Sequence, residues 1–285
     1  MSIVTRFAPS PTGFLHLGHV ASALVGWRCA RAAGGRFLLR IEDIDPTRCR
    51  PEFAAAIEED LAWAGLSWDG PVRAQSAHLP AYRAVLTTLA ERGLLYPCFC
   101  TRAEIQREVR EAASAPHAPD GSLRYPGTCR ALTPADRRHR LAAGAPHVLR
   151  LDMAAALRAA ATPLWFDDLR HGRVLCAPER FGDVVLARRD APASYHLCVT
   201  HDDAVQDVTL VTRGDDLLAA TDVHRVLQAV MGWPAPRYLH HPLLTDAEGR
   251  RLAKRDQALS VRALRAMGVG AEEVRRRATL AIPCG

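Results

Sequence analysis

The chain has 285 residues, of which 48% are hydrophobic and 24% charged, so it can bury a large core as one large domain with an insertion, or as two domains. Its formal net charge of +6 suits a polyanionic partner, although acidic and basic residues are well mixed and a merely basic enzyme would show the same charge. No stretch approaches the ~20 apolar residues that span a bilayer, and the N-terminus lacks a signal-peptide pattern, so we expect a soluble, cytoplasmic protein without a membrane partner.

Residues 1–97 alternate between predicted strands and helices. The predicted strands are 3–7 and 36–41, and the predicted helices are 20–32, 53–64 and 81–92. This alternation is typical of a parallel sheet with helices on both faces. We therefore expect an α/β fold whose ligands gather at the carboxyl ends of the strands.

Residues 98–190 interrupt the alternation with cysteine-bearing turns, a stretch rich in Pro, Ala and His, and short apolar runs at 148–151 and 184–186. The alternation resumes in 191–238. There the pattern predicts strands at 195–199 and 210–212 and a helix at 221–231.

A turn rich in proline and glycine separates the first predicted strand from the first predicted helix. Such a turn delivers backbone N–H groups and a helix dipole to an anion. His16 and His19 would lie at the first helical turn and donate to a phosphate, while Gly18 leaves room for a flat adenine against the backbone. A His-x-x-His pair can also bind a metal, but this segment offers no third ligand.

Lys254 is the only lysine of the chain, and the other 36 basic side chains are arginine. Lysine presents a compact charge on a flexible stem, which suits a phosphate, whereas arginine presents a wide planar fork. A single lysine left on a solvated surface would be the alternative. The two motifs together favour a phosphate site.

Both motifs resemble the signatures of class I aminoacyl-tRNA synthetases. His16-Leu17-Gly18-His19 is similar to the first signature, and residues 251–255 are similar to the second, lysine-bearing signature. Residues 6–13, 38–45 and 211–214 narrow the resemblance to the catalytic domain of glutamyl-tRNA synthetases, over about residues 5–259. The sequence departs from the pattern at Ala253, where the second signature usually has serine.

The resemblance implies a Rossmann-like catalytic domain with a zinc-bearing insertion. Its two halves would be 1–97 and 191–238, the insertion with an acceptor-like subdomain would be 98–190, and 239–285 would hold the lysine loop and a helical segment. Glutamyl-tRNA synthetases continue into an anticodon-binding domain, whereas this sequence ends 31 residues after Lys254. We therefore expect no anticodon-binding domain.

Members of the family truncated in this way attach glutamate to the queuosine base at the wobble position of tRNA(Asp). The expected activity is thus ATP-dependent activation of L-glutamate to glutamyl-adenylate, assisted by Mg²⁺, and transfer of the glutamyl group to the queuosine cyclopentenediol. The expected partners are L-glutamate, ATP and the queuosine-bearing anticodon stem-loop of tRNA(Asp). We expect a monomer.

The expected glutamate pocket follows from the charges of the substrate together with the resemblance. Glu42 would bind the α-ammonium, Arg6 and Arg213 the carboxylates, and Tyr195 would add a neutral donor. Ser10 is the fifth residue expected to bind glutamate. The expected ATP-binding and catalytic residues are, in full, Pro9, His16, Gly18, His19 and Lys254, of which the two histidines and the lysine would stabilise charge on the phosphates.

Each pocket residue also has a purely structural interpretation. Glu42 could pair with Arg40 or Arg48 at a strand end, and Tyr195 could be a half-buried aromatic. Likewise, Arg213 could pair with Asp215 or Asp216. Only the combination of these residues on one edge of the sheet favours the pocket.

Eight cysteines without a secretory signal predict reduced thiols. Cys98, Cys100 and Cys129 lie on two turns and could bind one Zn²⁺, or they could be unpaired buried thiols. Ligand chemistry alone makes His117 the natural fourth ligand. The resemblance instead points to Tyr125, because Tyr125-x-x-x-Cys129 matches the zinc-binding members of the family.

Three other functions fit parts of the sequence. A minimal glutamyl-tRNA synthetase would charge a tRNA 3′ end. A non-catalytic tRNA-binding paralogue is disfavoured by the intact His16, His19, Glu42 and Lys254. A small-molecule adenylyltransferase would have the same His-x-Gly-His turn but would lack the pocket of Glu42, Tyr195 and Arg213.

Overall fold

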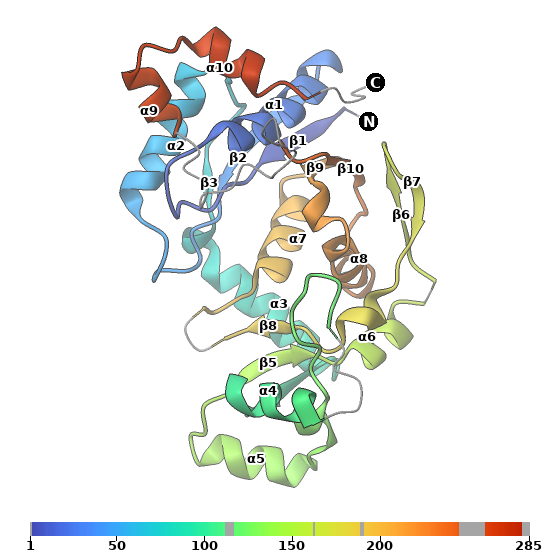
Figure 1. Cartoon of the computed structure of the whole chain (residues 1–285). Coiled ribbons are helices and arrows are strands. Elements are labelled where there is room, and N and C mark those ends of the chain that lie inside the picture. The colour runs from blue at the N-terminus through green and yellow to red at the C-terminus, as the bar shows by residue number, and fades with distance from the viewer. Residues whose placement is uncertain (1, 112–116, 162, 189–190, 245–259, 281–285) are drawn as a thin grey trace.

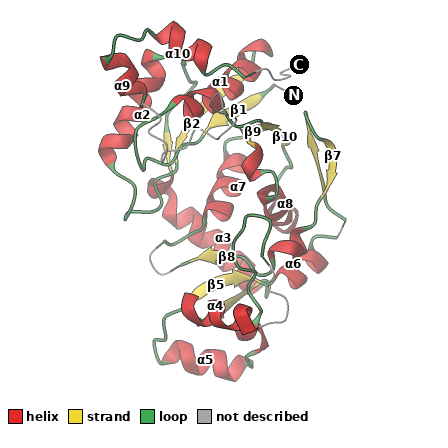
Figure 2. Ribbon diagram, in the orientation of Figure 1, coloured by secondary structure: helices red, strands yellow, loops and turns green. Residues whose placement is uncertain are grey.

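The computed structural model describes residues 2–111, 117–161, 163–188, 191–244 and 260–280 (Figure 1). Its strands are β1 (Val4–Phe7), β2 (Arg36–Ile41), β3 (Arg73–Ala74), β4 (Leu95–Cys98), β5 (Val148–Leu151), β6 (Trp165–Asp168), β7 (Gly172–Leu175), β8 (Val185–Ala187), β9 (Leu210–Gly214) and β10 (Arg237–His241). Its α-helices are α1 (Leu17–Ala32), α2 (Pro51–Trp63), α3 (Leu79–Glu91), α4 (Arg102–Glu111), α5 (Pro134–Ala142), α6 (Met153–Ala159), α7 (Tyr195–Val205), α8 (Ala220–Met231), α9 (Val261–Ala266) and α10 (Ala271–Arg277) (Figure 2).

Two sheets with parallel pairing form the part of the molecule that the sequence predicts to be catalytic. One has the order β1-β2-β3 and the other β7-β6-β10-β9, in which only the β6–β7 pair is antiparallel. They meet where β1 lies beside β9: the Thr209 amide donates to the Val4 carbonyl at 3.0 Å, and the Val4 amide donates to Thr209 Oγ1 at 2.9 Å. The expected α/β fold with a parallel sheet and helices is confirmed.

Helix α1 packs closely against this sheet. A Cβ on Gly26 would lie 2.8 Å from Thr212 Oγ1 and 3.3 Å from the ring of Phe37, so only glycine permits the approach at this point. The helix ends before Gly34, whose φ of +61° is the left-handed conformation expected of a glycine that closes a helix.

The strand predicted at 195–199 is wrong, because these residues begin helix α7. Ser194 caps the helix by accepting a hydrogen bond from the Leu197 amide at 3.4 Å. Residues 197–203 of the helix are all buried. A short run that is buried on every side cannot be assigned to a strand or to a buried helix by periodicity.

The residues of the predicted insertion take two positions. Strands β4, β5 and β8 form an antiparallel sheet that lies with α4 and α5 at the end of the molecule opposite to the termini (Figure 1). Hairpin β6–β7, by contrast, joins the catalytic part, because β6 pairs with β10 through Asp168 and Tyr238. The domain boundaries at residues 97 and 190 therefore stay a proposal. Hairpin β6–β7 lies between these boundaries in sequence but pairs with a strand outside them.

Helices α9 and α10 cover the outer side of α1 and α2 (Figure 1). The Val261 amide donates to the Leu15 carbonyl at 2.8 Å, and Ser260 forms a β-bridge with His16. Leu243 and Leu244, which precede the segment 245–259, line a cavity at the carboxyl ends of β1, β2 and β9. None of the described helices is long and apolar enough to cross a membrane.

Candidate active site

A cavity of about 440 Å³ opens at the carboxyl ends of β1, β2 and β9. It is lined by all the described residues that the sequence assigned to glutamate and ATP, namely Arg6, Pro9, Ser10, His16, Gly18, His19, Glu42, Tyr195 and Arg213. Lys254 lies outside the described residues. The structure thus brings segments that are up to 207 residues apart in sequence to one cavity.

His16 and His19 cap the N-terminus of α1 together. The Gly18 amide donates to His16 Nδ1 at 3.1 Å, the His16 amide donates to His19 Nδ1 at 3.2 Å, and the two rings lie 3.8 Å apart. Because each Nδ1 accepts a hydrogen bond, each neutral ring must carry its proton on Nε2. Both imidazoles are therefore donors at Nε2, which suits phosphate oxygens.

Glu42 follows directly after β2 and lines the cavity. Its carboxylate is 3.5 Å from Arg40 Nη2, so the ion pair considered from the sequence exists, while Arg48 pairs instead with Asp45 at 2.9 Å. Burial raises the pKa of Glu42 to about 7, even though Arg40 and Arg6 both lower it. A substrate ammonium beside Glu42 would favour its ionised form.

Arg6 is neutralised within the protein. Its Nε donates to Asp203 Oδ1 at 2.8 Å and its Nη2 to Oδ2 at 3.2 Å, which is a bidentate pair. Arg40, which is fully buried, also donates to Asp203 at 2.8 Å. The sequence analysis missed Asp203, which lies on α7, because the segment was assigned to a strand only as far as residue 199.

Arg213, at the end of β9, has different partners. Its three nitrogens donate to the side chains of His240, His224 and Thr221. The alternative pairing with Asp215 is not observed, because Asp215 pairs with Arg170 at 2.8 Å and with His171 at 3.0 Å. None of the three partners was predicted, although Thr221 and His224, as polar residues on a helix as buried as α8, gave a usable signal, whereas His240 lies on β10.

A second cavity, of about 280 Å³, adjoins the first. Ser10, Thr12, Glu42 and Tyr195 line both cavities. The remaining wall combines apolar side chains with polar ones, including Ile44, Cys49, Arg48, Arg188 and His196. A second molecule placed here would meet the contents of the first cavity at Glu42 and Tyr195.

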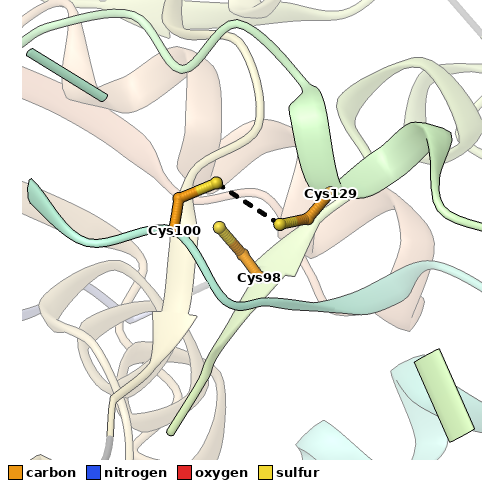
Figure 3. A group of neighbouring side chains, drawn as sticks. All are labelled: Cys98, Cys100 and Cys129. Carbon is orange, nitrogen blue, oxygen red and sulfur yellow. Dashed lines mark hydrogen bonds between the residues drawn. The ribbon is translucent and has the colours of Figure 1, made fainter. Parts of the chain in front are cut away.

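The three cysteines predicted to bind zinc lie together, with sulfur atoms within 4.8 Å of one another (Figure 3). Tetrahedral coordination with Zn–S bonds of ~2.3 Å requires sulfurs about 3.8 Å apart, so this spacing fits the ion. The Cys100 and Cys129 sulfurs are 3.4 Å apart. His117 is exposed and is not part of the cluster.

Tyr125 completes the surroundings of the cysteines. Its hydroxyl lies 3.4 Å from Cys100 Sγ and accepts a hydrogen bond from the Cys129 amide at 2.8 Å. Burial raises the pKa of Tyr125, and the guanidinium of Arg150 lies 3.9 Å from the centre of its ring. A phenol oxygen is thus available as a fourth ligand beside three sulfurs.

Comparison with known proteins finds a family whose model matches nearly the whole chain. The family model for the catalytic domain of class I tRNA synthetases (E and Q) matches residues 2–282. The glutamyl-Q tRNA(Asp) synthetase of Rhodobacter capsulatus is 47% identical over 290 residues, which cover 96% of this chain and 99% of that protein. The glutamate–tRNA ligase of Aquifex aeolicus is 38% identical over 266 residues, which cover 93% of this chain and 54% of that protein.

A solved structure shows the same similarity in space. The glutamate–tRNA ligase of Elizabethkingia meningosepticum, crystallised in complex with its amino acid, superposes with a TM-score of 0.75 at 30% identity. The match covers 90% of this chain and 52% of that one. The chain therefore spans about half the length of this solved relative.

Proposed function

The chain belongs to the class I tRNA synthetases of the glutamate and glutamine type, which are ligases, and from this premise we propose that it glutamylates a tRNA. The proposed reaction activates L-glutamate with ATP and transfers the glutamyl group to the cyclopentenediol of queuosine in the anticodon loop of tRNA(Asp). The observation that carries the proposal is the single cavity that gathers the glutamate-binding and ATP-binding residues predicted from distant segments. The names of the relatives supply the RNA.

In the first step, an oxygen of the glutamate α-carboxylate attacks the α-phosphorus of ATP, and pyrophosphate leaves. Glu42 binds the α-ammonium, and Tyr195 and Arg213 bind the side chain. The Nε2–H groups of His16 and His19 and the ammonium of Lys254 stabilise the charge that develops on the phosphates. Mg²⁺ bound to the phosphates would add charge neutralisation to the same step.

In the second step, a hydroxyl of the acceptor attacks the carbonyl carbon of the adenylate, AMP leaves, and the hydroxyl proton is released. The second cavity supports a base as the acceptor, because it opens beside Glu42 and Tyr195 and has Arg48 and Arg188 in its wall. Unpaired loop bases can enter such a cavity, since splaying them out costs less than opening a duplex.

The cysteine cluster supports a structural role for zinc in the insertion. We propose Cys98, Cys100, Cys129 and Tyr125 as the ligands of a site with no open position for catalysis. The cytoplasmic location and the monomeric state stay predictions of the sequence.

The test compares two preparations of tRNA(Asp), one with queuosine and one with guanosine at the wobble position. Each is incubated with ATP and labelled glutamate at two salt concentrations. We expect label only on the queuosine-bearing RNA, less of it at high salt because phosphate contacts release counterions, and survival of the label after removal of the 3′ adenosine. Equal labelling of both RNAs, or label confined to the 3′ adenosine, would identify a minimal glutamyl-tRNA synthetase instead.

A further inference from the structure

The guanidinium of Arg213 is buried and is held by three neutral side chains. Its Nε donates to His240 Nε2 at 3.0 Å, its Nη1 to His224 Nδ1 at 3.1 Å, and its Nη2 to Thr221 Oγ1 at 2.6 Å. Only 5% of Arg213 is exposed. Among the described residues, no carboxylate forms an ion pair with it.

The hydrogen bonds fix the protons of both histidines. A guanidinium only donates, so each ring nitrogen that Arg213 contacts must be an unprotonated acceptor. His240 therefore carries its proton on Nδ1, where it donates to Asp168 Oδ2 at 2.7 Å. His224 carries its proton on Nε2 and donates to His196 Nδ1 at 3.1 Å.

Both histidines are kept neutral by their surroundings. Burial lowers the pKa of His224 well below its usual value, and Arg213 lowers it further. Burial also lowers the pKa of His240, and this effect and that of Arg213 outweigh the opposing effect of Asp168. The two rings therefore contribute acceptors to Arg213 but no negative charge.

Arg6, which lies on the neighbouring strand β1 and donates to the Thr212 carbonyl at 3.3 Å, has its charge neutralised by Asp203 at 2.8 Å. A buried charge without a counter-ion is unfavourable, and an arriving group of opposite charge recovers that free energy. Three of the five N–H groups of Arg213 bond to protein side chains, and the guanidinium lines the cavity. Donors and an unmatched charge therefore face the amino-acid substrate.

We propose that His224, His240 and Thr221 are positioning residues that orient Arg213 without neutralising it, so that the side-chain carboxylate of the substrate completes the ion pair and a side-chain amide is rejected. This inference rests on the proposed activation of glutamate. It assigns the selectivity for an acid over an amide to a guanidinium that, among the described residues, has hydrogen-bond partners but no ion pair with a carboxylate.

Thr221 offers a sharp test, because aspartate has nearly its volume and would supply the missing counter-charge. Position 221 is in the first turn of α8, where an acidic side chain is favourable to the helix. Thr221→Asn is the matched control, since it differs from Thr221→Asp by the charge alone. The measurements are ATP–pyrophosphate exchange with glutamate and with glutamine, with tRNA present, and glutamate binding by calorimetry.

We expect Thr221→Asp to bind glutamate on the order of 30-fold more weakly than Thr221→Asn, with glutamine exchange nearly equal in the two variants. Equal ratios of glutamate to glutamine exchange in the two variants would overturn the inference. If the wild type exchanges neither amino acid, the proposed function fails, and the inference with it. If the wild type selects glutamate and both variants keep that selectivity, the inference is contradicted but the proposed function stands.

His224 gives a second test that survives if Thr221→Asp does not fold. In His224→Asn the side-chain oxygen can replace Nδ1 as acceptor, whereas His224→Leu removes the acceptor. We expect His224→Leu to raise the KM for glutamate about tenfold or more with a smaller change in kcat, and His224→Asn to restore most of the loss. Equal KM values for the two variants, or equal falls in kcat alone, would show that His224 serves only the fold.

Discussion

The active-site cavity and the cysteine cluster both bury polar side chains. In the cavity these side chains face an open space, whereas in the cluster they face one another. In the cavity, Arg213 and the Nε2–H groups of His16 and His19 direct donors toward a space of about 440 Å³. In the cluster, Cys98, Cys100 and Cys129 converge on one another, with sulfur atoms within 4.8 Å. Substitutions in the cavity should therefore change the rate of activation or the affinity for glutamate with little effect on stability. Substitutions in the cluster should lower stability with little effect on activation.

The largest effect on activation is expected at Lys254. Lys254→Ala should lower the rate of ATP–pyrophosphate exchange on the order of 10²- to 10³-fold, by analogy with the removal of one group that stabilises a transition state. Glutamate affinity and the melting temperature should stay nearly unchanged. Lys254→Arg should also be impaired, because the planar fork replaces a point charge. Near-normal exchange by Lys254→Ala would remove the lysine from the site.

The next effect is expected at Glu42, which faces the α-ammonium in the proposed complex. Glu42→Gln keeps the shape but loses the charge, so glutamate affinity should fall by about 1.5–3 kcal/mol, which is the usual value of a hydrogen bond to a charged group. Asp45→Asn, which removes an acid close by in sequence from the wall of the second cavity, is the control. Unchanged glutamate affinity in Glu42→Gln would favour the purely structural pair with Arg40.

The pKa of Glu42 predicts how this affinity depends on pH. Burial raises that pKa to about 7, so below pH 7 the carboxyl group is mostly protonated and must lose its proton before it binds an ammonium. The KM for glutamate should therefore rise as the pH falls, approaching about tenfold per pH unit well below 7, and should level off above it. Kinetics between pH 5.5 and 8.5 measure the profile. A flat profile in the wild type, or the same slope in Glu42→Gln, contradicts the assignment.

The smallest effect on activation is expected at the cysteine cluster. Cys129→Ser should release zinc, because a ligand is lost, and should lower the melting temperature by about 2–4 °C for each kcal/mol of unfolding free energy. Glutamate activation below that temperature should change little. Cys176→Ser makes the same change of atom outside the cluster and should keep the metal. Metal analysis that finds no zinc in the wild type would leave the cluster as three buried thiols.

The sequence predicted the parts of the fold and site that depend on local pattern. The strands at 36–41 and 210–212, the helix at 221–231 and the histidine turn at α1 follow from periodicity and turn residues, and the structure confirms these elements. The signature motifs then supplied the residues of the cavity. Their roles in binding and catalysis stay predictions.

What could not be predicted depends on contacts between distant segments. The run from Leu197 to Asp203 is buried on all sides, so its helix is decided by the layers that bury it and not by its own pattern. The pairing of Arg6 with Asp203 joins residues 197 positions apart, and no local pattern contains such a pair. Of the neutral partners of Arg213, His240 lies on another strand, whereas Thr221 and His224 on the buried helix α8 gave a signal that went unused.

Hairpin β6–β7 lies within the predicted insertion by sequence but contacts the proposed amino-acid pocket in space. Asp168 of β6 accepts hydrogen bonds from both the backbone amide and the ring of His240, whose other ring nitrogen accepts from Arg213. A continuous line of four hydrogen-bonded groups thus runs from the hairpin backbone at Arg170 through Asp168 and His240 to the guanidinium. Two side chains, Asp168 and His240, thus separate the hairpin backbone from Arg213, so we expect a shift of the hairpin to move the guanidinium.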